Sequence, residues 1–167
     1  KYLFIIGDSV DGVGVYPGQE EFLEIKDVVE QYNELAKLLG MIRKDITIII
    51  CGGQHDTLRL DEPQPKLDTI YAGELFRLPN LISVSNPSLV NIGKNESFEG
   101  FDILVYHGAS FHHYKDNVES LRKVNATNNP SFILQYLLQK RHLAPTHGSV
   151  SFIPDAKEDF LVIERVP

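Results

Sequence analysis

Three short clusters of polar residues and glycines in this sequence contain the side chains that hydrolytic sites use. The clusters are Gly7-Asp8-Ser9-Val10-Asp11-Gly12, Gly52-Gly53-Gln54-His55-Asp56 and Tyr106-His107-Gly108. Carboxylate, imidazole and amide groups are ligands for Mn, Zn or Fe. A carboxylate that bridges two such ions can hold them ~3.5–4 Å apart, an arrangement that stabilises the attacking and leaving oxygens of a phosphoryl displacement. Taken alone, Asp8 could equally cap a turn, His55-Asp56 could be a surface pair, and His107 could be a structural histidine.

Each cluster follows a run of apolar residues that is typical of a buried strand, namely Lys1–Ile6, Ile46–Cys51 and Phe101–Tyr106. Between the first two runs, apolar residues recur at helical spacing from Glu20 to Leu39, which predicts an amphipathic helix ended by Gly40. This strand–helix–strand order predicts a βαβ unit with parallel strands. Because open α/β sheets bind ligands at the carboxyl ends of their strands, we expect Asp8, His55 and His107 to meet at one rim.

The remaining pattern completes an α/β fold that we expect to form one domain over residues 1–167. We predict a short helix near Thr69–Phe76, a helix over Ser131–Arg141, and strands near Leu81–Val84, Leu89–Ile92, Ser151–Ile153 and Phe160–Ile163. The segment Phe111–Asn129 is polar and rich in Asn, and its composition predicts an irregular surface segment.

Composition and charge limit the classes of protein to which the chain can belong. With 167 residues, 43% of them hydrophobic, it is long enough for one domain with a core. Its apolar runs are far shorter than the ~20 residues that a membrane helix needs. The net charge of −7 argues against a general electrostatic grip on a nucleic-acid backbone. A single cysteine, Cys51, favours an intracellular compartment. Because the chain starts without Met and has an apolar strand at each end, we expect a domain that is incomplete at both ends.

At the three clusters the sequence resembles the calcineurin-like metallophosphoesterases, whose signature includes Gly-Asp, Gly-Asn-His-(Asp/Glu) and His motifs. One branch is closer, the small subunit of archaeal D-family DNA polymerase. The stretches that resemble it are GDSVDGVGVYPGQ (Gly7–Gln19), EPQP (Glu62–Pro65), NPS (Asn86–Ser88), YHG (Tyr106–Gly108), KRHLAP (Lys140–Pro145) and EDFLVIERVP (Glu158–Pro167). This resemblance covers nearly the whole chain.

The resemblance implies a metallophosphoesterase β-sandwich flanked by helices and a 3′→5′ exonuclease that proofreads for a large polymerase subunit. Asp8 would bridge two divalent ions, Mn or Mg in the first place with Fe or Zn as alternatives, and His107 would ligate one of them. His55 would stabilise developing charge or protonate the leaving oxygen, oriented by Asp56. The implied partners are the large catalytic subunit, DNA and the sliding clamp, in the cytoplasm and without a membrane.

Two departures from the family signature weaken the expected metal site. The family's Asn ligand is replaced by Gln54, which carries the same amide on a stem one methylene longer. The Asp-x-His and Gly-His-x-His motifs are not in this chain, so we expect the chain alone to bind metal poorly and to have little nuclease activity.

Two other functions and one further contact remain open at this stage. A non-catalytic scaffold, like the eukaryotic polymerase B-subunits, would be consistent with Gln54 and the anionic surface. A phosphomonoesterase would explain the metal motifs but not VDGVGVYPGQ or RHLAP. Arg59, Arg141 and His142 are candidate DNA contacts, with ordinary surface charges as the alternative for each.

Overall fold

The structure, a computed structural model, describes residues 1–165, which form two compact units. The first unit contains Lys1–Leu60, Gln64–Ser88 and Val105–His107. The second contains Asp61–Pro63, Leu89–Leu104 and the described residues from Gly108 onward. Each unit is described below by itself. The expected single domain over residues 1–167 stays a prediction, and Val166 and Pro167 lie outside the described residues.

The first unit is built on a three-stranded sheet with the order β1–β2–β3, formed by β1 (Tyr2–Ile6), β2 (Thr47–Cys51) and β3 (Leu81–Ser83). Both pairings are parallel, with Ile6 opposite Cys51 and Ile50 opposite Ser83. β2 is buried on both faces from Ile48 onward, as its unbroken apolar run predicts. β1 lies at the edge of this sheet, and its first and last residues are exposed, so its expected full burial is wrong.

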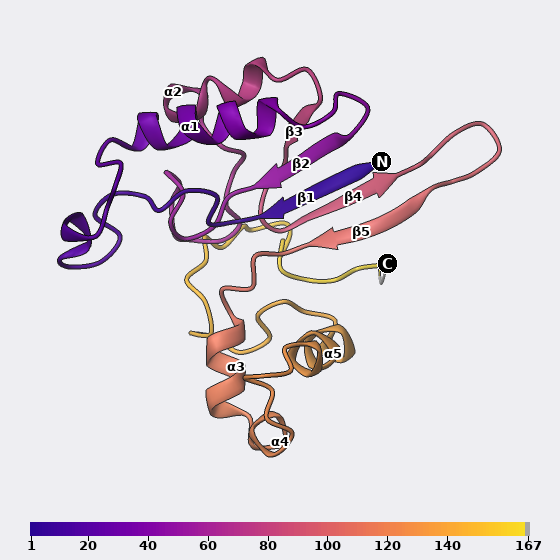
Figure 1. Cartoon of the computed structure of the whole chain (residues 1–167). Coiled ribbons are helices and arrows are strands. Elements are labelled where there is room, and N and C mark those ends of the chain that lie inside the picture. Colours follow the sequence, from indigo (N-terminus) through magenta and orange to yellow (C-terminus); the bar gives the residue numbers. More distant parts are fainter. Residues whose placement is uncertain (166–167) are drawn as a thin grey trace. The chain divides into compact units, whose positions relative to one another are not determined.

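Helix α1 (Val28–Gly40) crosses from β1 to β2 and, together with α2 (Thr69–Ala72), covers one face of the sheet (Figure 1). The predicted helix was longer, because the apolar spacing begins at Phe22. The side chain of Asp27 instead accepts hydrogen bonds from the backbone N–H groups of Val29 and Glu30 and so fixes the helix start at Val28. Upstream, only a 3₁₀ turn, η1 (Gln19–Glu21), forms.

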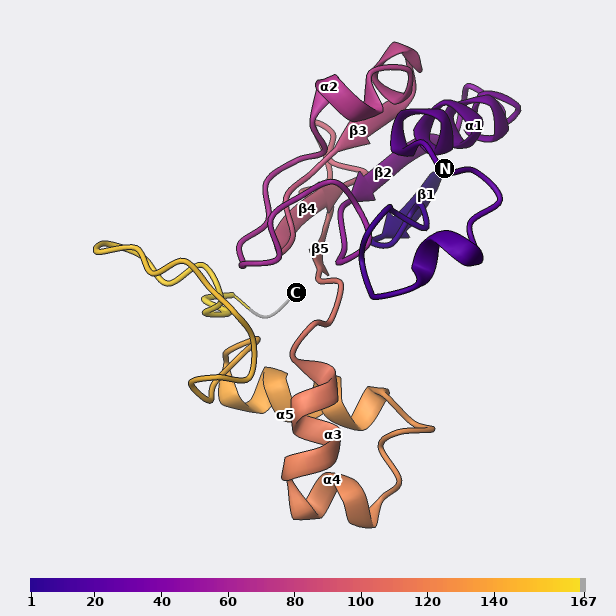
Figure 2. The same ribbon diagram turned by 90° about the vertical axis from the view of Figure 1, so that its left-hand side faces the viewer.

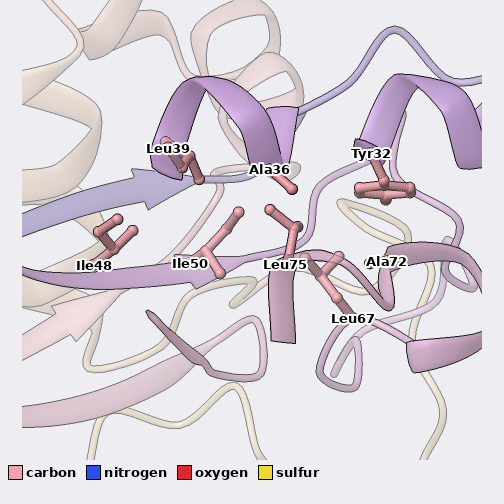
Figure 3. Close-up of a cluster of buried hydrophobic side chains, with 8 residues drawn as sticks. All are labelled: Tyr32, Ala36, Leu39, Ile48, Ile50, Leu67, Ala72 and Leu75. Atoms are coloured by element: carbon pink, nitrogen blue, oxygen red, sulfur yellow. The ribbon is translucent and has the colours of Figure 1, made fainter. Parts of the chain in front are cut away.

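The core of the first unit lies between α1 and β2 (Figure 3). Eight buried side chains form it: Tyr32, Ala36, Leu39, Ile48, Ile50, Leu67, Ala72 and Leu75. The three from α1 follow one face of the helix, as its amphipathic pattern predicts. The predicted helix near Thr69–Phe76 is present as α2 followed by the 3₁₀ helix η2 (Leu75–Arg77).

The other two strands form a sheet of their own. β4 (Ser88–Ile92) and β5 (Phe101–Val105) run in opposite directions as a two-stranded sheet (Figure 1). Both strands were predicted. The expectation that the strand before His107 is the third parallel strand of the βαβ sheet is wrong, because β3 takes that place beside β2.

The segment predicted to be irregular, Phe111–Asn129, contains two helices of the second unit, α3 (Phe111–Asn117) and α4 (Glu119–Lys123). They lie together with α5 (Ser131–Lys140), which matches the helix predicted there (Figure 2). Tyr114 and Leu121 are buried in one cluster with residues of α5. Burial of these two side chains stabilises helices that the polar composition of the segment does not favour.

No strand forms at Ser151–Ile153 or Phe160–Ile163, where strands were predicted; only isolated bridges at Phe152 and Val162 occur. The side chain of Asp155 accepts hydrogen bonds from the backbone N–H groups of Lys157 and Glu158, and that of Asp159 accepts one from the N–H of Leu161. These local bonds make turns in place of a strand ladder.

The mixture of helices and sheets agrees with the predicted α/β class, whereas the metallophosphoesterase sandwich stays a prediction. Among the described residues, no helix combines the length and the apolar character needed to cross a bilayer.

Candidate functional site

The register of β1 and β2 brings the first two polar clusters side by side. Ile6 and Cys51 are paired, so the residues that follow them leave the sheet together, and the backbone N–H of Gly7 donates to the oxygen of Cys51 at 3.2 Å. The backbone N–H of His55 donates to Asp8 Oδ1 at 2.9 Å, although the two residues are 47 positions apart. The two loops after β1 and β2 therefore form one rim, as predicted.

Two glycines leave the room that this rim needs. A side chain on Gly7 would place its Cβ 2.1 Å from His107 Nδ1, and one on Gly53 would lie 2.4 Å from both the backbone nitrogen and Oδ1 of Asp8. Asp8 itself has φ +47°, a left-handed conformation that non-glycine residues rarely adopt. The loops are thus shaped to hold the Asp8 carboxylate against His107.

The third predicted residue reaches the same place. His107 Nε2 lies 3.4 Å from Asp8 Oδ1, and the His107 side chain is largely buried whereas that of Asp8 is partly open to solvent. All three of Asp8, His55 and His107 belong to the first unit. The Asp8 carboxylate and the His107 imidazole therefore meet, although His107 follows a strand of the other sheet, and His55 joins them through its backbone N–H. That the His55 imidazole completes one shared site with them stays a prediction.

In both histidines the Nδ1 atom of the ring contacts a backbone carbonyl oxygen. His107 Nδ1 lies 3.0 Å from the carbonyl oxygen of Ile6, and His55 Nδ1 lies 2.8 Å from that of Asp11. A carbonyl oxygen only accepts hydrogen bonds, so each Nδ1 must carry a proton. In the neutral ring, the lone pair is then on Nε2, which is the atom offered to a proton or to a metal ion.

Asp56 is almost completely buried and acts as the anchor of the site. Its carboxylate accepts hydrogen bonds from the Ser9 hydroxyl at 2.6 Å, the Tyr32 hydroxyl at 2.8 Å and the Gly53 N–H at 2.8 Å. Burial, with the Asp56 charge as a second cause, raises the pKa of Tyr32 well above its usual value, so the hydroxyl remains a donor.

This anchor differs from the role that the sequence predicted for Asp56. The ring of His55 is oriented by the carbonyl oxygen of Asp11, and the Asp56 carboxylate joins the loop after β1, the loop after β2 and helix α1. Asp56 therefore fixes the positions of the loops that carry Asp8 and His55.

Two buried amides that the sequence analysis missed connect His107 to the loop after β2. Asn86 Oδ1 accepts from the backbone N–H of His107 at 2.8 Å, and Asn86 Nδ2 donates to Gln64 Oε1 at 2.7 Å. Gln64 Nε2 donates in turn to the carbonyl oxygens of Gly53 and Arg59. The signal was available in part, since a polar residue lies beside Pro in both EPQP and NPS.

The residues present supply part of a metal shell. Ligand bonds of about 2.0–2.2 Å at tetrahedral angles place two ligand atoms about 3.4 Å apart, which is the distance between Asp8 Oδ1 and His107 Nε2. Within residues 1–165, however, no group of three or more His, Cys, Asp or Glu side chains is placed to hold an ion. The predicted ligand Gln54 is exposed on the loop after β2, directly before His55. Asp8 and His107 thus fit as two donors, and a complete shell needs more.

The three candidate DNA contacts lie in different settings. Arg59 is exposed on the loop after β2 in the first unit. In the second unit, Arg141 Nε donates to the carbonyl oxygen of Ile163 at 2.8 Å, and His142 Nε2 lies 3.1 Å from Asp159 Oδ2. The side chains of Arg141 and His142 are therefore engaged in internal contacts.

Burial also governs the only cysteine of the chain, Cys51, at the end of β2. Its side chain is fully buried, and burial raises the pKa of the thiol to about 11. A protonated, inaccessible thiol is neither a nucleophile nor a metal ligand. Cys51 therefore belongs to the core beneath the site.

Comparison with known proteins gives one consistent result, although no protein-family model matches the chain. The chain is 44% identical over 167 residues to the DNA polymerase II small subunit of Methanothermobacter thermautotrophicus, covering 100% of the chain and 33% of that protein. It is 44% identical over 165 residues to the protein of the same name from Methanocaldococcus jannaschii, covering 99% of the chain and 26% of that protein. The corresponding protein of Archaeoglobus fulgidus is 41% identical over 169 residues, with 32% of its length covered. The chain thus spans a third or less of each of these curated relatives.

Proposed function

Because the chain is homologous along its whole length to a segment of the archaeal DNA polymerase II small subunit, we propose that it works within such a subunit, beside a large catalytic subunit, in DNA replication. We further propose that the cluster of Asp8, His55 and His107 is the part of this subunit that hydrolyses phosphodiester bonds, as a 3′→5′ exonuclease. The sliding clamp as a partner and a cytoplasmic location remain predictions from the sequence.

One observation carries the catalytic proposal. Asp8 Oδ1 and His107 Nε2 lie 3.4 Å apart, and the Nδ1 atoms of both histidines are bound to backbone carbonyl oxygens. A surface pair or a structural histidine would not require two imidazoles fixed in the same tautomer, one of them beside a carboxylate whose residue has a left-handed backbone conformation. Strain and fixed tautomers of this kind gather at functional sites.

The residues would divide the chemistry between them. Asp8 and His107 would hold a divalent cation, Mn or Mg in the first place, together with donors from outside these residues. A cation bound there would supply positive charge to the oxygens of the phosphodiester. His55, when protonated at Nε2, can donate that proton to the leaving 3′ oxygen, while the carbonyl of Asp11 keeps the ring in place. Asp56 keeps the two loops together and takes no direct part.

The test is digestion of a primer with a mismatched 3′ end by the full-length protein in complex with its large subunit, in the presence of Mn²⁺. We expect His55→Ala to lower the rate by about 10²–10⁴-fold, the usual contribution of a general acid. Asp8→Asn should lower it further by removing a metal ligand. His112→Ala, at an exposed position of α3, is the matched control. Full activity of either site variant would refute the catalytic assignment.

A second function, that of a non-catalytic scaffold, is favoured by one specific observation. Among the described residues only two metal donors come together, and Asp8 and His107 are close enough to form an ion pair with each other. A scaffold would keep this pair as a structural contact. Full-length protein that co-purifies with the large subunit, yet takes up no Mn²⁺ in calorimetry, would support this function over the nuclease.

A further inference from the structure

A groove runs along the first unit beside the loop that carries His55. It has a volume of about 600 Å³, within the range of sites that hold small ligands. Its lining comes from the loop after β2, the segment before α2 and the side chain of Phe76: Thr57, Leu58, Arg59, Lys66, Thr69 and Phe76 are among the residues. The groove begins two residues after His55.

The groove is lined by cations and by an aromatic ring, in a chain whose net charge is −7. Arg59 and Lys66 are exposed, and no carboxylate of residues 1–165 forms an ion pair with Lys66. The one acid of the lining, Asp68, accepts a hydrogen bond from the N–H of Ile70 and so serves the start of α2. Phe76 is 40% exposed. Charge therefore favours an anionic occupant, and the ring offers a surface for stacking.

The walls of the groove are joined to the Asp8–His55–His107 cluster by buried contacts. The carbonyl oxygen of Arg59 accepts a hydrogen bond from Gln64, which is bonded through Asn86 to the backbone N–H of His107. Gly52 leaves room for Leu58, which lines the groove, since a Cβ at Gly52 would lie 2.1 Å from the Leu58 side chain. The position of the groove relative to the cluster is thus fixed within the first unit.

We propose that this groove binds a single-stranded nucleic acid and leads its 3′ end to the Asp8–His55–His107 cluster. The inference rests on the proposed function, because it names the substrate and its path to that site. A phosphate would lie against Lys66, and an unpaired base would stack on Phe76. Aromatic rings bind single strands in this way without sequence preference, because every base has a face to stack. A paired base would leave the ring without a partner.

The test is binding of a labelled oligothymidylate of about 12 nucleotides to the full-length protein, followed by fluorescence anisotropy over a series of salt concentrations. EDTA is present, so the measurement does not depend on hydrolysis. Lys66→Gln should reduce the slope of log affinity against log salt by about 0.7, the value for one phosphate contact with a single strand. Phe76→Leu should weaken binding by about 5- to 150-fold.

Conservative variants and distant controls separate binding from folding. Lys66→Arg and Phe76→Tyr keep the charge and the ring, so they should bind as the unmodified protein does. Lys44→Gln and Phe101→Leu change an exposed cation and an exposed ring outside the groove and should have no effect on binding.

Unchanged binding by Lys66→Gln and Phe76→Leu would overturn the proposal. So would loss of the large subunit from these variants with DNA binding intact, since the groove would then be a protein-docking surface. These outcomes are distinct from failure of the proposed function, in which Asp8→Asn retains nuclease activity whatever the groove binds.

Discussion

Removal of the Tyr32 hydroxyl tests whether Asp56 anchors the two loops of the site. In Tyr32→Phe, Asp56 Oδ1 loses the hydroxyl donor at 2.8 Å but keeps the Ser9 hydroxyl at 2.6 Å, and the Thr57 N–H loses the oxygen that it contacts at 3.2 Å. A hydrogen bond to a charged group contributes about 1.5–3 kcal/mol. Because Asp56 retains its other donors, we expect a loss near the lower end, about 1.5–2 kcal/mol.

The loss can be measured by hydrogen exchange with mass spectrometry on peptides from α1 and β2, whose slowest amides exchange through opening of the core. A loss of 1.5–2 kcal/mol corresponds to exchange that is about 10- to 30-fold faster. Tyr71→Phe, at an exposed tyrosine of α2, should change exchange by less than threefold and serves as the control. In a protein that already carries Asp56→Asn, the Tyr32→Phe substitution should lower stability by less, because the charge that strengthens the hydrogen bond is absent. Equal effects of Tyr32→Phe and Tyr71→Phe would refute the anchoring role.

Three further outcomes follow from the geometry. Gly53→Ala should reduce exonuclease activity by about 100-fold by displacing Asp8, since misplacement by ~1 Å can cost that much; Gly40→Ala, whose Cβ would meet nothing closer than Leu78 at 3.7 Å, should keep activity, and equal loss would contradict the argument. Asn86→Ala should destabilise the first unit by about 2–5 kcal/mol in hydrogen exchange, because it leaves buried partners at His107 and Gln64 unbonded; Asn33→Ala, at a partly exposed position of α1, should change stability by less than 0.5 kcal/mol. Between pH 9 and 11 the unfolded Cys51 thiol ionises while the folded thiol, whose pKa burial raises from 9.0 to about 11, does not. Folding stability should therefore fall across that range by about 3 kcal/mol at most, a fall that Cys51→Ala should lessen in denaturation curves.

The sequence predicted those parts of the fold that depend on the period of apolar residues. The strand β2 is an unbroken apolar run, and helix α1 repeats apolar residues at helical spacing, so the existence of both could be predicted without coordinates. The start of α1 was missed, although Asp27 followed by Glu30 three residues later is a helix-capping pattern. Phe22 and Ile25 match the helical spacing by chance, because they lie before the N-cap residue Asp27 and outside the helix.

Other features could not be predicted, because they depend on partners distant in the sequence. Helices α3 and α4 are stabilised by the packing of Tyr114 and Leu121 against α5. The residues within Phe111–Asn129 do not show that such a partner exists. The meeting of Asp8, His55 and His107 was predicted from strand ends, but the strand before His107 belongs to another sheet. What brings His107 to Asp8 is a set of bonds to Ile6 and Asn86, which are single contacts without a local pattern.

The backbone at Asp8 has a consequence for how this chain can change over time. With φ at +47°, the position suits Asn or Gly better than Asp, while Asn would also keep an oxygen for the N–H of His55. One substitution, Asp8→Asn, would thus remove the charge while keeping the backbone conformation and an oxygen for the N–H of His55. A lineage that stopped using this carboxylate could lose it by a single substitution. A chain that keeps Asp at this position retains the residue that is less suited to the backbone conformation.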